Sequence, residues 1–157
     1  MRTAVEADGQ SGYDDGMNDG AARTGGEVFL VDIEELKEHE KTSAVRVALV
    51  LASLVMKGAF TTPLLVDAAS MTILDGHHRY AAARILGLER VPCWCVDYFD
   101  DASVALAPRR QAIAVSKEEV VRRGMAGDLY PRKTTRHAYE VPPAPLFTLR
   151  ELRRKKK

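Results

Sequence analysis

The segment Ile73–Tyr80 contains an aspartate, two histidines and an arginine, residue types that can bind ligands or transfer protons. It reads Ile-Leu-Asp-Gly-His-His-Arg-Tyr. The β-type residues before Asp75 predict a strand, and the residues after Gly76 follow a helical period. The free N–H groups and the positive dipole end of such a helix attract anions, and the guanidinium of Arg79 adds a bidentate fork. The segment therefore predicts a phosphate-binding turn.

Asp75 calls for a different role, because a carboxylate beside this turn would repel phosphate. It is better suited to be a general base or a holder of Mg²⁺, with N-capping of the helix as the structural alternative. The adjacent His77 and His78 favour a functional role. A transition-metal or haem site made with His39 and His137 is less favoured, since side chains adjacent on a helix point about 100° apart.

The elements that position this segment follow from its surroundings. Strands are expected at Val28–Asp32, Leu64–Asp67, Thr72–Leu74, Val91–Tyr98 and Val104–Leu106. Helices are expected at Ala44–Lys57 after Thr42 or Ser43, from His77 to a left-handed Gly87, at Lys117–Met125 behind a Ser116/Glu119 capping box, and at Phe147–Leu152. The stretch 128–137 is expected to be a polar loop. This alternation predicts a mixed α/β domain.

Two further features concern packing. The helix Ala44–Lys57 is apolar on nearly every face, which predicts burial on several sides. Cys93 and Cys95 stand two apart on a predicted strand and so face one way, and two thiols alone do not make a zinc site. We expect them to be buried structural cysteines.

Composition bounds the class of protein. The 157 residues suit one domain, and 46% hydrophobic with 29% charged residues excludes a wholly disordered, collagen-like or coiled-coil chain. The formal net charge of +1 provides no global field for nucleic acid or an anionic membrane. The longest apolar run, Val47–Met56, is too short to span a bilayer. We expect a soluble cytoplasmic protein with no membrane partner and with nucleic acid disfavoured.

The chain divides into three parts. Residues 1–26 hold six of the eleven glycines and five acids, which predicts a flexible leader. Residues 27–152 form the expected domain. Residues 153–157 are an uninterrupted basic run, interpreted as a solvated tail, with a weak nucleic-acid patch as the alternative.

Three blocks, in order along the chain, resemble the ParB/sulfiredoxin fold and within it the free L-serine kinase branch. They are His39-Glu40 after Ile33–Leu36, the segment Ile73–Pro92, and Lys-Thr-Thr-Arg-His at Lys133–His137. The stretch Glu118–Gly124 leads into the third block. The resemblance implies a mixed α+β domain with a small mixed sheet and flanking helices.

The resemblance also implies an activity, the transfer of a phosphoryl group from ATP or ADP, accompanied by Mg²⁺, to the hydroxyl of free L-serine. The product would be O-phospho-L-serine. The matching positions are Glu40 and Asp75 for catalysis, Gly76, His77, His78 and Arg79 for the nucleotide phosphates, and Ser53, Thr134, Thr135, Arg136 and His137 for serine. Such transfer needs a carboxylate to take the hydroxyl proton and cations to balance the phosphoryl charge. Ser53 has an alternative role as a core serine bonded back to Leu49.

Two other members of the fold are alternatives. Sulfiredoxin chemistry needs a nucleophilic cysteine where this chain has His77. A ParB-like transcriptional or DNA-partitioning regulator would use the same turn as a nucleotide switch. Against it stand the missing helix-turn-helix lobe, the near-neutral charge and the second histidine of the motif. Compared with such kinases, this chain has less sequence between Val91–Tyr98 and its Thr-Thr-Arg-His block. We expect an accessory lobe to be missing there, which leaves the nucleotide-base pocket and the choice of donor open.

Overall fold

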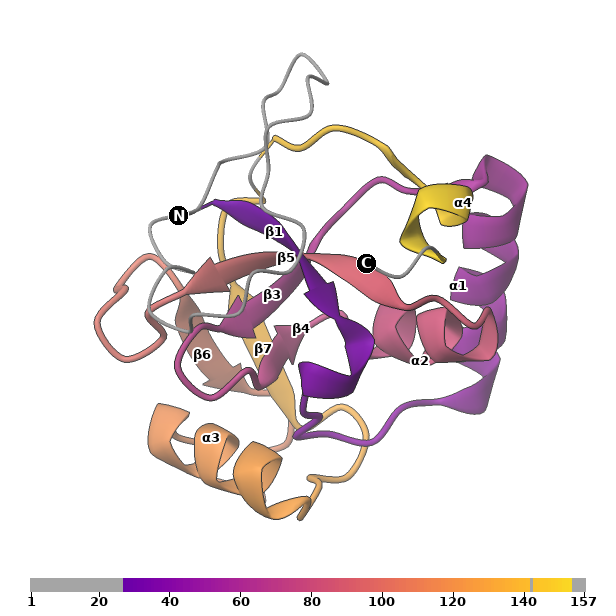
Figure 1. Cartoon of the computed structure of the whole chain (residues 1–157). Coiled ribbons are helices and arrows are strands. Elements are labelled where there is room, and N and C mark those ends of the chain that lie inside the picture. Colours follow the sequence, from indigo (N-terminus) through magenta and orange to yellow (C-terminus); the bar gives the residue numbers. More distant parts are fainter. Residues whose placement is uncertain (1–26, 142, 154–157) are drawn as a thin grey trace.

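The computed structural model describes residues 27–141 and 143–153, and a small mixed sheet lies at its centre (Figure 1). Its strand order is β1 (Val28–Asp32), β5 (Arg90–Val96), β3 (Leu64–Asp67) and β4 (Ile73–Asp75). The pairs β1–β5 and β3–β4 are antiparallel, and β3–β5 is parallel. The mixed sheet confirms the predicted fold class.

Two buried cores hold helices against this sheet. One includes side chains from α1 (Ala44–Lys57), α2 (His77–Ile85) and α4 (Leu149–Leu152), and the other includes Val120 from α3 (Lys117–Ala126). Figure 1 shows α1, α2 and α4 on one side of the molecule and α3 at another. The remaining elements are the turn η1 (Ile33–Glu35) and two short sheets, β2 (Ala59–Phe60) with β8 (Phe147–Thr148), and β6 (Ala105–Pro108) with β7 (Thr135–Ala138). No helix in the described ranges is long and apolar enough to cross a membrane.

Most local signals give the expected elements. Ser43 caps α1 by accepting the Arg46 N–H, and Gly58 ends the helix at φ +67°. Ser116 caps α3 by accepting the Glu119 N–H. Cys93 and Cys95 are free and buried. The predicted leader 1–26 and residues 154–157 of the predicted tail lie outside the described residues.

Two expectations were wrong. On α1 only Val47 and Leu54 are buried, while Leu49 and Met56 are 65% and 87% exposed. The helix packs through a single stripe, so its apolar composition overstated its burial. The expected loop 128–137 contains the start of β7, because residues 135–138 pair with β6.

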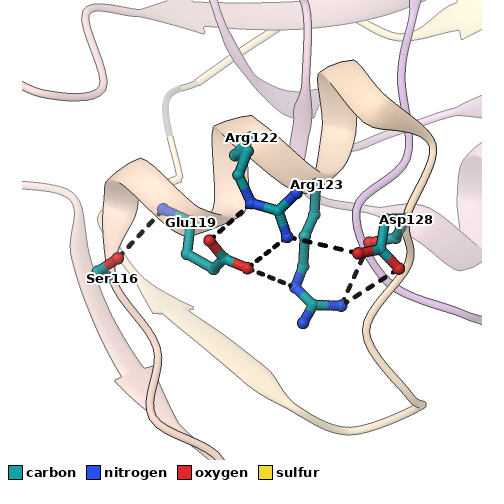
Figure 2. A network of polar contacts seen from close by, with 5 residues as sticks. All are labelled: Ser116, Glu119, Arg122, Arg123 and Asp128. Atoms are coloured by element: carbon teal, nitrogen blue, oxygen red, sulfur yellow. Dashed lines mark hydrogen bonds and ion pairs between the residues drawn. The ribbon is translucent and has the colours of Figure 1, made fainter.

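Polar contacts hold α3 and the chain that follows it (Figure 2). Glu119 accepts hydrogen bonds from Arg122 and Arg123, and both arginines also reach Asp128. The hydrogen bonds from Arg122 and Arg123 lower the pKa of Glu119 to about 2, so these contacts persist until the pH falls toward that value. The Arg123 guanidinium lies 4.1 Å from the centre of the Tyr130 ring. Tyr130 in turn donates its N–H to the His39 carbonyl, so α3 supports the chain beside Glu40.

Gly124 lets α3 approach the sheet closely, since a Cβ there would lie 2.5 Å from Thr72 Oγ1. We expect Gly124→Ala to lower the free energy of unfolding by about 1–3 kcal/mol, despite the better helix propensity of alanine. Urea unfolding measures this loss. The control Met125→Ala alters an exposed side chain on the same helix and should change stability by less than about 0.5 kcal/mol. Equal stability of the two variants would contradict the close packing.

Candidate active site

One pocket gathers residues from four separate parts of the chain: the stretch 40–50, which includes the start of α1, the stretch 74–79 at the start of α2, Arg109, and the stretch 132–137. Its charged and polar lining residues are Glu40, Lys41, Ser43, Arg46, Asp75, His77, His78, Arg79, Arg109, Arg132, Lys133, Thr135, Arg136 and His137. Gly76, Val50 and Leu74 complete the wall. The pocket therefore contains most of the predicted site residues.

The predicted phosphate turn lies at the start of α2. Gly76 has φ +107°, and a Cβ there would lie 2.5 Å from Leu64 Cδ2 and 2.8 Å from Arg79 Nη2. Only glycine fits this backbone and this space. Arg79 Nη2 donates to the Pro63 carbonyl at 3.2 Å, and its buried Nε has no hydrogen-bond partner among the described residues. A buried donor without a partner is suited to an anion.

Glu40 ties the chain before α1 to the stretch 133–135. Its Oε1 accepts the Thr135 N–H at 2.8 Å and the Thr135 hydroxyl at 2.7 Å, and its Oε2 accepts the Lys133 N–H at 3.1 Å. Lys133 takes a left-handed φ of 59°, which is uncommon for a non-glycine residue. The carboxylate thus fixes an unusual backbone turn at the pocket wall.

Asp75 stands at the end of β4, directly before the phosphate turn. The Tyr139 hydroxyl donates to its Oδ2 at 2.6 Å. Burial, with the hydrogen bond to Asp75 and the charge of that carboxylate, raises the pKa of Tyr139. Tyr139 therefore stays protonated and orients Asp75.

Three of the four histidines form a neutral cluster at the pocket, in which His39 and His77 are buried and His137 is half-buried. The ring of His39 lies 4.6 Å from that of His77 and 5.9 Å from that of His137. Burial lowers the pKa of His39 to about 4 and of His137 to about 3, and it holds that of His77 well below its usual value. His77 Nε2 accepts the His39 N–H at 3.2 Å. That nitrogen of His77 is thus occupied by backbone.

His78 joins two helices, and the positive charges in the pocket affect its pKa. Its Nε2 accepts the Ser43 N–H at 3.2 Å, which joins the start of α2 to the start of α1. Burial lowers the pKa of His78, and the positive charges of Arg46, Arg109 and Arg79 lower it further. The cations act together on one point of the pocket.

Some predicted site residues take other places. Ser53 is exposed on α1 and does not line the pocket, whereas Ser43 does. Thr134 is buried, and its hydroxyl donates to the Pro131 carbonyl at 2.6 Å. Sequence reasoning missed the cations Lys41, Arg46, Arg109 and Arg132. Arg109 and Arg132 each stand next to a second basic residue, at 109–110 and 132–133, whereas Lys41 and Arg46 have no such signal.

The fold of the chain is similar to that of solved free serine kinase structures. A solved variant of a free serine kinase in complex with AMP matches with a TM-score of 0.70 and 16% identity, over 88% of this chain and 99% of that chain. This chain has the free serine kinase fold. No family model matches it.

Two curated kinases align with part of the chain. An ATP-dependent L-serine kinase of Desulfurococcus mucosus is 32% identical over 77 residues, which cover 46% of this chain and 30% of that kinase. An ADP-dependent L-serine kinase of Thermococcus kodakarensis is 33% identical over 76 residues, which cover 46% and 31%. The matched parts thus span about a third of these relatives. The predicted resemblance to the free serine kinase branch of the ParB-like fold is confirmed.

Proposed function

We propose that the chain transfers a phosphoryl group from ATP or ADP to the hydroxyl of free L-serine, giving O-phospho-L-serine. One observation carries this proposal: a phosphate turn and a carboxylate-anchored basic stretch face the same pocket. The named activities of the curated relatives, which are ATP-dependent and ADP-dependent serine kinases, support it.

The donor's phosphates bind at the start of α2. Backbone N–H groups and the helix dipole attract them there, and the unpartnered Nε of Arg79 adds a charged donor. His77 and His78 shape this turn through their contacts with His39 and Ser43. Arg46 and Arg109, which already act on His78, balance charge on the transferred group.

Asp75 fits a magnesium ion that accompanies the nucleotide. Mg²⁺ is usually held by one or two carboxylates and the substrate's phosphates, and Asp75 is a carboxylate placed directly before the phosphate turn. When bound, the ion would draw charge from the phosphoryl oxygens.

Glu40 takes the proton of the serine hydroxyl. It is bonded to Thr135 and Lys133, in the block that the resemblance assigns to serine, so it lies where the acceptor would bind. The Thr135 hydroxyl orients this carboxylate by donating to it. His39 Nε2 lies 3.0 Å from the same hydroxyl oxygen. Thr134 holds the turn from behind through Pro131.

Arg136 binds the serine carboxylate. It is exposed and lines the pocket beside Glu40's partner Thr135. A bidentate guanidinium contact exists equally in the ground and transition states. His137, with its Nε2 held 2.7 Å from the Tyr98 hydroxyl, fixes the strand that carries Arg136.

We expect Arg136→Ala to raise the KM for serine by about 10- to 100-fold, with a much smaller change in the nucleotide KM. Steady-state kinetics with each substrate varied in turn measures the two constants. Arg150→Ala, an exposed arginine on α4, is the matched control. A rise confined to the nucleotide KM would show that this stretch binds phosphate instead.

The direct test of the proposed function is an assay of the purified chain with L-serine, Mg²⁺ and either nucleotide. Phosphoserine should form and should depend on all three additions. Nucleotide hydrolysis without phosphoserine would overturn the proposal.

A further inference from the structure

A second hollow adjoins the pocket on its basic side. It is lined by Ser43, Val45, Arg46, Arg110, Arg132 and Lys133, of which all but Val45 and Arg110 also line the pocket. We call this second hollow the basic annex. Arg110 donates from Nε and Nη2 to the Arg132 carbonyl at 3.0 and 2.6 Å, so it is held against the annex wall.

The pocket and annex concentrate positive charge. The cations of the pocket are Lys41, Arg46, Arg79, Arg109, Arg132, Lys133 and Arg136, against the acids Glu40 and Asp75. The annex adds Arg110 and no acid. The whole chain carries a net charge of only +1, so this surface is a local concentration of charge. Burial lowers the pKa of His78 at the start of α2, and the charges of Arg46, Arg109 and Arg79 lower it further.

The lining residues are of types that suit phosphate binding, since many are cationic and none of those described is Phe, Tyr or Trp. Among the described residues, no Phe, Tyr or Trp lines either the pocket or the annex. Proteins that bind nucleic-acid single strands combine a basic groove with aromatic stacking platforms. The described lining supplies cationic contacts for successive phosphates and no aromatic platform for successive bases, which favours a phosphate polymer over a nucleic-acid strand.

We propose that this chain also accepts inorganic polyphosphate as a phosphoryl donor, with the terminal phosphate at the turn before α2 and the following units along the basic annex. The proposal rests on the proposed serine kinase function and extends its donor. Each unit of the polymer carries negative charge, and the annex gives those units a further cationic partner, Arg110, next to the cations that it shares with the pocket.

The reaction balances without a further reactant. The serine hydroxyl oxygen forms a bond to the terminal phosphorus, and the P–O–P bond to the next unit breaks. The shortened polyphosphate leaves with the electron pair of that bond, and Glu40 takes the hydroxyl proton. The products are O-phospho-L-serine and a polymer one unit shorter.

The test compares donors in one assay of phosphoserine formation, with ATP, ADP or linear polyphosphate of defined length. The wild-type chain should form phosphoserine with polyphosphate in the absence of nucleotide. Arg110→Ala should lower the ratio of polyphosphate-dependent to ATP-dependent rates about tenfold or more, as expected for one lost charge-assisted contact. Arg150→Ala should leave that ratio unchanged.

The outcomes separate this inference from the proposed function. Activity with ATP or ADP but none with polyphosphate would overturn the donor proposal and leave the serine kinase function standing. No phosphoserine with any donor would overturn both. Salt-dependent binding of a single-stranded oligonucleotide that is lost in Arg110→Ala, with polyphosphate inactive, would assign the annex to nucleic acid and also overturn the donor proposal.

Discussion

Glu40→Gln should lower the turnover of serine phosphorylation by about 10²–10⁴, the usual cost of removing a general base. Glutamine keeps the size of the side chain, and its oxygen can still accept the Thr135 N–H and hydroxyl that now meet Oε1. Its amide cannot accept the Lys133 N–H or a substrate proton. The fold should therefore survive while the chemistry fails, which circular dichroism and single-turnover kinetics would show together.

Two variants keep this result interpretable. Thr135→Val removes the hydroxyl bonded to Glu40 but keeps the backbone N–H, so it should lower turnover much less than Glu40→Gln. Glu118→Gln, an exposed glutamate on α3, should have no effect. Near-normal turnover of well-folded Glu40→Gln would remove the role of base from Glu40.

Asp75→Asn should lower activity by about 10²-fold or more at low Mg²⁺ and recover part of it as Mg²⁺ is raised. Asparagine can still accept the Tyr139 hydroxyl, so the local structure should persist. What it loses is the negative charge beside the phosphate turn. A Mg²⁺ titration of the initial rate measures this dependence.

The Mg²⁺ dependence distinguishes Asp75→Asn from Glu40→Gln, because added metal cannot replace a lost general base. Rates of Glu40→Gln should stay low at every Mg²⁺ concentration. If Asp75→Asn is inactive at all Mg²⁺ concentrations and Glu40→Gln is active, the two carboxylates exchange roles and Asp75 is the base.

Local signals explain why the strand, turn and helix around Gly76 were predictable. Asp75 and Gly76 end a strand and begin a helix within a few residues, and no distant partner is needed to make that turn. The same holds for the Ser43 and Ser116 caps, which bond to N–H groups three residues on. For such local features, the spacing of residues in the sequence is enough to predict the structure.

The rest of the site depends on distant contacts. Glu40 and Thr135 are 95 residues apart, and residue types alone gave no sign of their hydrogen bonds, so only the family resemblance linked them. His77 was expected on the phosphate side, yet its Nε2 meets the backbone of His39, 38 residues away. Arg46, Arg109 and Arg132 come from separate segments and converge only through tertiary packing.

Helix α1 shows the opposite error. Its apolar residues were taken to need partners on several sides, yet Val45, Leu49, Val55 and Met56 are exposed. The hydrophobic composition of a helix sets an upper limit on the apolar surface that it can bury. The surface that α1 actually buries depends on its packing, which occurs through Val47 and Leu54.

The most direct test of the account is the stoichiometry of transfer by the purified chain, with L-serine, Mg²⁺ and ATP or ADP followed by ³¹P NMR. The account predicts one O-phospho-L-serine formed for each nucleotide consumed, with no consumption when serine is omitted and no product from Glu40→Gln on the same timescale. Tight nucleotide binding with no phosphoserine under any of these conditions would contradict it and would favour a nucleotide-binding regulator on the same fold.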